Sequence, residues 1–193
     1  MDIWLATSNS GKVNEFKSLL HGKGLVFHQL SEVKNYHSPA ETGETFLDNA
    51  RIKAKSLKSV MPDQWVVAED SGLQVKGLKD LPGVHSARYA GDKATDHENV
   101  AKVMKMVNLR TPTERSAKFV CCIVAISPTG EEFVFDGVVE GSISKKVAGT
   151  AGFGYDVCFI PEGEEKTFAE LGIPFKNKVS HRAQAIRKLV EIF

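Results

Sequence analysis

One stretch of this chain is apolar at every position over the length of a strand. Residues Phe119 to Ile126 read FVCCIVAI, which leaves no polar side chain to face water. Such a strand must be covered on both faces, as a central strand of a layered α/β fold is. A turn at 128–130 leads into a second run, Glu132 to Val139, which we expect to pair with the first as its antiparallel neighbour.

Hydrophobic periodicity predicts further elements around this strand. Short apolar runs indicate strands at 3–7, 25–30, 65–68 and 157–160. Amphipathic spacing predicts helices at about 13–20, 44–60, 95–107 and from 180 to the end. Thr95 and Glu98 have the spacing of a capping box at the third helix. This order predicts one α/β domain, residues 1–193, with a mixed, elongated sheet flanked by helices.

Composition limits the class of partner. The chain has 25 lysines and arginines against 24 acidic residues, so it lacks the excess positive charge that attracts nucleic-acid polymers. No apolar stretch approaches the length of a membrane span, and the first residues lack the pattern of a secretory signal. Cys121, Cys122 and Cys158 form no C-x-x-C pair, so we expect reduced thiols and a cytoplasmic protein.

A small polar segment joins the first predicted strand to the first helix; its residues are Thr7, Ser8, Asn9, Ser10, Gly11 and Lys12. Free backbone amides and the helix dipole at such a position favour a phosphate, and Lys12 adds a full positive charge. The segment is not a Walker A loop, because Val13 follows the lysine where Ser or Thr should stand. A simple turn is the alternative interpretation.

Acidic residues form the second candidate site. Glu41 precedes the second helix, and Glu69 and Asp70 follow the strand at 65–68, which we expect to end before them. Carboxylate oxygens suit magnesium, which usually takes one or two protein carboxylates. Glu41 could instead favour the helix N-terminus. Two adjacent carboxylates after a buried strand repel each other unless a cation or solvent relieves them, which favours a functional role for Glu69 and Asp70.

Two later segments complete the set. Glycines flank an aromatic ring in Gly152 to Asp156, which suits stacking on a nucleobase, although a tight turn with a core phenylalanine is equally consistent. Basic side chains cluster from Lys176 to Arg182, around the expected start of the last helix. Cations there oppose the helix dipole, so we expect an anionic or hydrogen-bond-accepting ligand nearby.

Together these residues resemble the inosine triphosphate pyrophosphatase family, which removes deaminated purine nucleotides from the precursor pool. The similarity runs the whole length and preserves the family's motif order. It rests on Ala6–Lys12, Glu41–Gly43 with Asn49–Ala50, Ala68–Leu73, Leu81–Gly83, Ser86–Tyr89, Gly152–Asp156 and Ser180–Arg182. The family often has glycine at the place of Ser8, and the resemblance leaves the share of Glu69 in metal binding undecided.

The resemblance implies a fold, a reaction and a set of site residues. The fold is an elongated mixed α/β structure with two lobes around a central nucleotide-binding cleft, usually a homodimer. The reaction is magnesium-dependent hydrolysis of ITP, dITP or XTP to the monophosphate and pyrophosphate. Glu41 and Asp70 would bind Mg²⁺, with Asp70 also orienting or deprotonating the attacking water. The implied substrate-binding residues are Thr7, Ser8, Asn9, Ser10, Gly11, Lys12, Ser71, Phe153, Gly154, Tyr155, Asp156, Lys176, His181 and Arg182.

Selectivity for the base should come from donors that reach the purine 6-position. A buried Arg182 or His181 donor would lose its partner on adenine, at a cost of roughly 1 to 3 kcal/mol per bond. Three other functions are consistent with parts of the sequence: a related pyrophosphatase acting on modified pyrimidine or standard triphosphates, a nucleotide-binding module without turnover, and a phosphotransferase.

Overall fold

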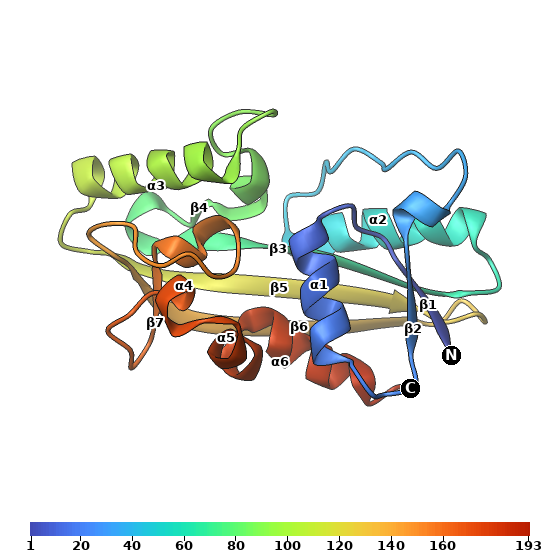
Figure 1. Ribbon diagram of the computed structural model, residues 1–193. Helices are drawn as coiled ribbons and strands as arrows, with labels where there is room; N and C mark the ends of the chain where they lie inside the picture. Colours follow the sequence, from blue (N-terminus) through green and yellow to red (C-terminus); the bar gives the residue numbers. More distant parts are fainter. The chain divides into compact units, whose positions relative to one another are not determined.

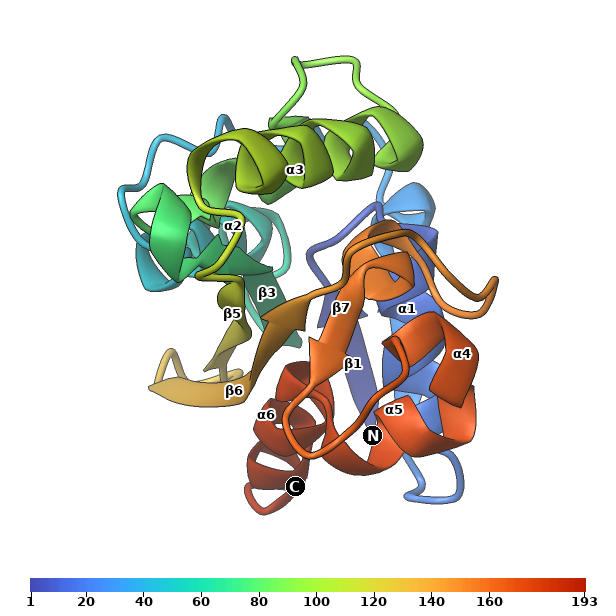
Figure 2. The ribbon, with the colours of Figure 1, turned by 90° about the vertical axis from the view of Figure 1, so that its left-hand side faces the viewer.

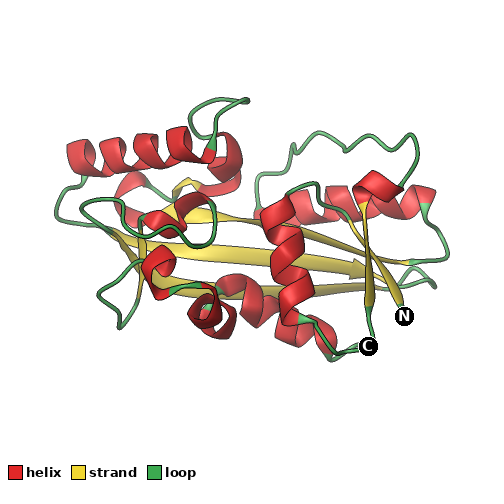
Figure 3. Ribbon diagram, in the orientation of Figure 1, coloured by secondary structure: helices red, strands yellow, loops and turns green.

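The computed structural model describes all 193 residues and contains both helices and strands (Figure 3). The strands are β1 (Asp2–Leu5), β2 (Val26–Gln29), β3 (Trp65–Val75), β4 (Leu81–Pro82), β5 (Ser116–Ile126), β6 (Glu132–Ile143) and β7 (Phe159–Pro161). The helices are α1 (Ser10–Leu19), α2 (Phe46–Val60), α3 (Asp96–Arg110), α4 (Phe168–Leu171), α5 (Ile173–Val179) and α6 (His181–Val190). None of these helices combines the length and the apolar character needed to cross a bilayer.

The strands form a seven-stranded sheet in the order β2-β1-β3-β5-β6-β7, with β4 paired to β3 (Figure 1). β1 is parallel to both β2 and β3, whereas β4 and β7 run antiparallel to β3 and β6. The predicted mixed α/β fold is therefore confirmed. The two runs 119–126 and 132–139 are neighbours in the sheet, as expected, joined by a turn in which the Gly130 amide donates to the Ser127 carbonyl.

The chain divides into two compact units. The first, unit 1, comprises residues 1–70, 121–136 and 184–193; the second, unit 2, comprises residues 71–120 and 137–183. The boundary falls between Asp70 and Ser71, within β3. Each unit has its own apolar core.

Unit 1 has helices on both faces of its strands (Figure 1). Val66 and Ala68 of β3 pack with the alanines of α2, whereas Val67 packs with apolar residues of α1 and α6. This alternation follows from the strand period of two residues. Continued along β3, it places Glu69 on the α1 and α6 face and Asp70 on the α2 face.

Unit 2 is organised around α3 (Figure 2). It also contains a cluster of aromatic rings formed by Phe119, Phe159 and Phe168. Val100, Val103 and Val107 of α3 enter the same core as Leu73 and Phe119 from the strands. The predicted capping box of α3 is present: the Thr95 hydroxyl accepts from the Glu98 amide, and the Glu98 carboxylate accepts from the Thr95 amide. The helix therefore begins where the sequence predicted.

The third strand does not end where the sequence predicted. We expected it to stop at Ala68 and to deliver Glu69 and Asp70 at its carboxyl end, but β3 continues to Val75. The expectation was wrong because pairing sustains the strand beyond the acidic residues: β3 pairs with β5, which is remote in sequence, and Gln74 and Val75 also lie opposite β4. β1 ends at Leu5, opposite Val67, so the acidic pair lies just beyond the parallel part of this sheet.

Candidate functional site

The segment between β1 and α1 leads into a helix whose first turn has no acidic residue. The Asn9 side chain caps α1 by accepting from the Lys12 amide at 3.0 Å, and the Thr7 hydroxyl accepts from the Asn9 amide at 3.2 Å. The first amides of a helix, here those of Ser10 and Gly11, have no partner within the helix. Ser8 and Ser10 are exposed.

The other long capped helices differ at this position. Asp48 of α2 and Glu98 of α3 complete capping boxes, whereas α1 has no acid in its first turn and carries Lys12 there. A lysine opposes the helix dipole, so the start of α1 is strongly positive. These features suit a phosphate, as the sequence indicated.

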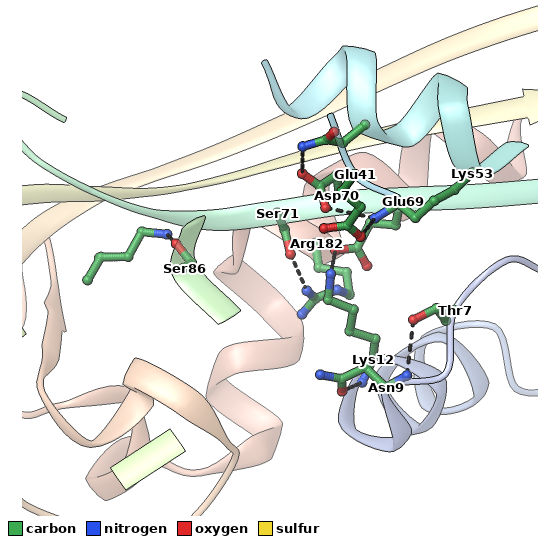
Figure 4. A network of polar contacts seen from close by, with 12 residues as sticks. Thr7, Asn9, Lys12, Glu41, Lys53, Glu69, Asp70, Ser71, Ser86 and Arg182 are labelled. Atoms are coloured by element: carbon green, nitrogen blue, oxygen red, sulfur yellow. Dashed lines mark hydrogen bonds and ion pairs between the residues drawn. The ribbon is translucent and has the colours of Figure 1, made fainter. Parts of the chain in front are cut away.

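The carboxylates of Glu41 and Asp70, 29 residues apart in sequence, converge on one ammonium group. Lys53 Nζ lies 3.1 Å from Glu41 Oε1 and 2.7 Å from Asp70 Oδ1 (Figure 4). The side chain of Asp70 is only 8% exposed and that of Lys53 12% exposed. Glu41 and Asp70 thus direct their oxygens toward a common region of positive charge, as the metal prediction requires.

Asn49 connects the loop that carries Glu41 to the strand that carries Asp70. The buried Asn49 side chain accepts from the Gly43 amide at 2.8 Å and donates to Asp70 Oδ2 at 3.4 Å. Gly43 is required by this approach, because a Cβ there would lie 2.8 Å from the Asn49 amide nitrogen and carboxamide oxygen. The position of the loop relative to Asp70 is thereby fixed.

Burial and charge act in opposite directions on this pair. Burial raises the pKa of Asp70 above its ordinary value of 3.8, although the charges of Lys53 and Lys12 oppose the change. Burial alone would lower the pKa of Lys53. The charges of Asp70 and Glu41 outweigh this effect, so the pKa of the ammonium is raised. Asp70 is therefore a better proton acceptor than an exposed aspartate, while Lys53 stays charged.

Glu69, the neighbour of Asp70, has a different partner. Its Oε1 lies 3.2 Å from Nζ of Lys12, and its side chain is 1% exposed (Figure 4). The repulsion that we expected between the adjacent carboxylates is relieved by two lysines. Lys12 pairs with Glu69 and Lys53 with Asp70, and the charge of Lys12 also acts on Asp70.

In unit 2, the segment that contains Phe153 is held by a buried ion pair. Asp156 accepts from the Phe153 amide at 2.9 Å and pairs with Lys176, and both charged side chains are at most 3% exposed. Lys176 Nζ lies 4.6 Å from the centre of the half-buried Phe153 ring. Gly152 is indispensable there, because a Cβ would lie 2.1 Å from Asp156 Oδ2.

Arg182 and His181 are also buried in unit 2. The Arg182 guanidinium donates to the Ser71 hydroxyl at 2.9 Å and lies 5.7 Å from the Phe153 ring centre (Figure 4). The His181 ring stacks on Phe119 at 4.7 Å between centroids. Phe153 is thus flanked by two cationic groups, a setting that suits a flat, electron-rich ring.

Tyr155 is placed differently from its neighbours in the glycine-bearing segment. Its ring belongs to the core of unit 2, and its hydroxyl donates to the Ser86 carbonyl at 2.8 Å. The Gly154 amide donates to Asp96 at 2.8 Å. Tyr155 therefore holds the segment 152–156 against the loop that contains Ser86.

The physical argument for Lys176 from the sequence was wrong. We placed this lysine before the last helix, where the dipole would oppose it. Instead, Lys176 and Lys178 lie in the last turn of a separate helix, α5, which begins after Gly172 with Pro174 in its first turn. The dipole favours cations at that end, so only His181 and Arg182 occupy an unfavourable helix start.

Comparison with known proteins decides the family. The sequence profile of the Ham1 family matches residues 3–192. The chain belongs to the Ham1 family. A Bdellovibrio bacteriovorus protein named dITP/XTP pyrophosphatase is 50% identical over 192 residues, covering 99% of this chain and 96% of the relative. A Bacillus subtilis protein of the same name is 40% identical over 188 residues, covering 97% and 94%.

Solved structures of the Ham1 family have the same fold. The structure of a HAM1 protein from Coxiella burnetii superimposes with a TM-score of 0.89 at 36% identity, covering 100% of this chain and 98% of the other. The Staphylococcus aureus Ham1 protein gives a TM-score of 0.87 at 36% identity, covering 100% and 97%. The resemblance stated from the motifs is confirmed.

Sequence reasoning gave no role to two residues that the structure places beside Asp70, although Asn49 was among the motif residues. Asn49 and Lys53 are four residues apart on α2, so they share one side of the helix. The amphipathic pattern of α2 places its lysines on the faces outside the apolar stripe and does not distinguish Lys53 from the others. The available signal was that both residues border the apolar stripe of Ala50 and Ala54, which packs against β3.

Proposed function

We propose that this chain hydrolyses deaminated purine nucleoside triphosphates, such as ITP, dITP and XTP, to the monophosphate and pyrophosphate. The observation that supports this most strongly is the convergence of Glu41 and Asp70 on one cationic position in unit 1, which also contains the positively charged start of α1. Relatives that match nearly all of this chain carry the name dITP/XTP pyrophosphatase.

The donor set of Glu41 and Asp70 fits Mg²⁺. Magnesium usually takes one or two protein carboxylates and fills its other positions with water and phosphate oxygens. Glu41 and Asp70 are the two protein ligands that we propose, since both approach one cationic group. When bound, magnesium would neutralise charge on the phosphates and polarise a water.

The residues of unit 1 would bind the triphosphate and position the attacking water. Amides at the start of α1 and the ammonium of Lys12 would hold the phosphate oxygens. Asp70 would orient the water, which the metal would polarise, and would accept its proton. The water oxygen bonds to the α-phosphorus, the bond to the α,β-bridging oxygen breaks, and pyrophosphate leaves with that electron pair.

The residues of unit 2 would recognise the nucleoside. The ring of Phe153 would stack on the base, held by the Lys176–Asp156 ion pair. Arg182 and His181 would supply donors for the purine 6-oxygen, and an amino group at that position would leave a buried donor unpaired. Ser71 would touch the substrate beside Arg182. Tyr155 and Gly154 would contribute through the backbone, because the Tyr155 ring lies in the core.

The remaining predictions extend this proposal. A cytoplasmic location is supported by the three free cysteines, of which Cys121 and Cys158 are buried. A homodimer and a nucleotide cleft shared by two lobes are implied by the family resemblance alone.

Incubating the purified protein with ITP, XTP, GTP and ATP, with and without magnesium, tests the proposal. We expect inosine and xanthosine monophosphates with pyrophosphate, in the presence of magnesium only. Release of orthophosphate, or equal turnover of all four nucleotides, would contradict it. A modified pyrimidine triphosphate in the same panel tests the alternative that the protein is a related pyrophosphatase for pyrimidine nucleotides.

A further inference from the structure

Glu69 and Asp70 are adjacent in sequence but face opposite sides of β3. Val67, two residues before Glu69, packs against α1 and α6, and Ala68, two residues before Asp70, packs against α2. The partners of the two acids agree with this alternation. Lys12, the partner of Glu69, comes from α1, whereas Lys53, the partner of Asp70, comes from α2.

This arrangement separates the two acids chemically. Glu41 and Asp70 share an ammonium at 3.1 and 2.7 Å, so their oxygens lie close enough to meet at one cation. Glu69 instead directs Oε1 toward Lys12 at 3.2 Å. A carboxylate on the opposite face of the strand is poorly placed to become a third ligand of a metal held by Glu41 and Asp70.

The burial of Glu69 adds a second reason. The side chain of Glu69 is 1% exposed, whereas that of Lys12 is 15% exposed. The carboxylate is therefore held in the protein interior, and the ammonium is the member of the pair that reaches solvent. A long lysine side chain has many rotamers, and a buried anion at its tip selects among them. The same anion partly neutralises the cluster of positive charge at the start of α1.

We infer that Glu69 is a positioning residue: it holds the Lys12 ammonium in the orientation that contacts the triphosphate and takes no part in metal binding. This inference rests on the proposed function, because it assigns Glu69 a role toward the same substrate. The adjacency of Glu69 and Asp70 in sequence would instead suggest that both acids bind the metal.

The test is a double-mutant cycle with Glu69→Gln and Lys12→Met. Glu69→Gln should lower kcat/KM for ITP about 10- to 100-fold, since small errors in the position of a binding group have effects of this size. In the Lys12→Met background the same change should have almost no further effect, because the residue through which Glu69 acts is absent. Lys17→Met, which removes an exposed lysine from the same helix, is the control and should leave kcat/KM unchanged.

Metal affinity supplies a readout that activity does not. Calorimetric titration with Mn²⁺ alone should give the same affinity for Glu69→Gln as for the wild-type protein, and a lost or much weaker affinity for Glu41→Gln. If Glu69→Gln does not fold, Glu69→Asp keeps the charge but shortens its reach, and it enters the same cycle and titration.

The outcomes separate this inference from the proposed function. Additive effects in the cycle, or loss of Mn²⁺ affinity in Glu69→Gln, would overturn the role of Glu69 while ITP hydrolysis by the wild-type protein persists. Absence of ITP hydrolysis by the wild-type protein would overturn the proposed function itself, and the role of Glu69 with it.

Discussion

The ammonium of Lys53 lies 2.7 Å from Oδ1 of Asp70, with the carboxylate of Glu41 3.1 Å away on the same nitrogen. Two acids from distant segments therefore share a single positive charge inside unit 1. A divalent cation bound by Glu41 and Asp70 would satisfy the same two carboxylates, so Lys53 and the cation would compete for them. The first two predictions concern this cluster.

Replacing Asp70 with Asn should separate binding from turnover. The amide keeps the size of the side chain but can neither accept the water proton nor supply an ionised ligand. We expect kcat for ITP to fall about 100- to 10,000-fold. Affinity for an α,β-methylene analogue of ITP, measured by calorimetry, should change little. Asp63→Asn removes an exposed acid from the same unit and serves as the control. Near-normal kcat in Asp70→Asn would refute the assignment.

Replacing Lys53 with Met should destabilise the protein and make its stability depend on magnesium. Loss of one partner from a buried ion pair typically costs about 3–5 kcal/mol, or about 6–20 °C in melting temperature for a chain of this size. Magnesium should restore part of the loss, because it can replace the missing positive charge. Thermal unfolding with and without MgCl₂ measures both effects. The exposed Lys55→Met is the control, and an equal loss there would contradict the prediction.

Replacing Gly152 with Ala should disturb the Phe153 segment. The new Cβ would lie 2.1 Å from Asp156 Oδ2, and φ of +79° already disfavours a side chain. We expect KM for ITP to rise about tenfold or more as the Asp156–Lys176 pair shifts, because misplaced binding groups have effects of that order. Gly163→Ala is the matched control: its φ is +83°, but nothing lies within 4 Å of the added atom. If both variants raise KM equally, contact with Asp156 is not the cause.

The bridge between His28, Asp2 and Glu32 should make stability depend on pH. Hydrogen bonds to Asp2 and Glu32, at 2.8 and 2.9 Å, raise the pKa of His28 above its ordinary value of 6.5. A group with a raised folded-state pKa contributes stability that is complete below its unfolded pKa and is lost as pH rises through the folded value. Melting temperature should therefore fall as pH rises above about 6.5.

His28→Gln tests the origin of this pH dependence. Glutamine can still hydrogen-bond to one acid, but it carries no charge to lose. The slope of melting temperature against pH above neutrality should therefore be smaller in His28→Gln than in the wild-type protein. An identical slope in the two proteins would assign the pH dependence to other groups.

Local patterns predicted those parts of the fold that depend on local physics. Periodicity located α2 and α3, and the Thr95–Glu98 spacing fixed the start of α3. The extent of β3 could not be predicted in this way, because β3 pairs with β5, a strand far along the chain that no local signal identifies as its partner. Once β3 is known to continue, its period of two residues places Glu69 and Asp70 on opposite faces.

The candidate site was partly predictable for similar reasons. Motif resemblance selected Glu41, Asp70 and Lys12, which the structure gathers in unit 1. Lys53 was missed because a lysine on an amphipathic helix is usually solvated, and only the position of α2 shows that this one points to Asp70. Lys176 was assigned to the wrong end of a helix because α5, a short helix after Gly172, was not identified.

The position of bond cleavage tests the central claim most directly. ITP is hydrolysed in water enriched in ¹⁸O, and the two products are analysed by mass spectrometry. If Asp70 positions a water at the α-phosphorus, one labelled oxygen should appear in inosine monophosphate and none in pyrophosphate. Label in pyrophosphate, or in released orthophosphate, would place the attack at another phosphorus and contradict the account.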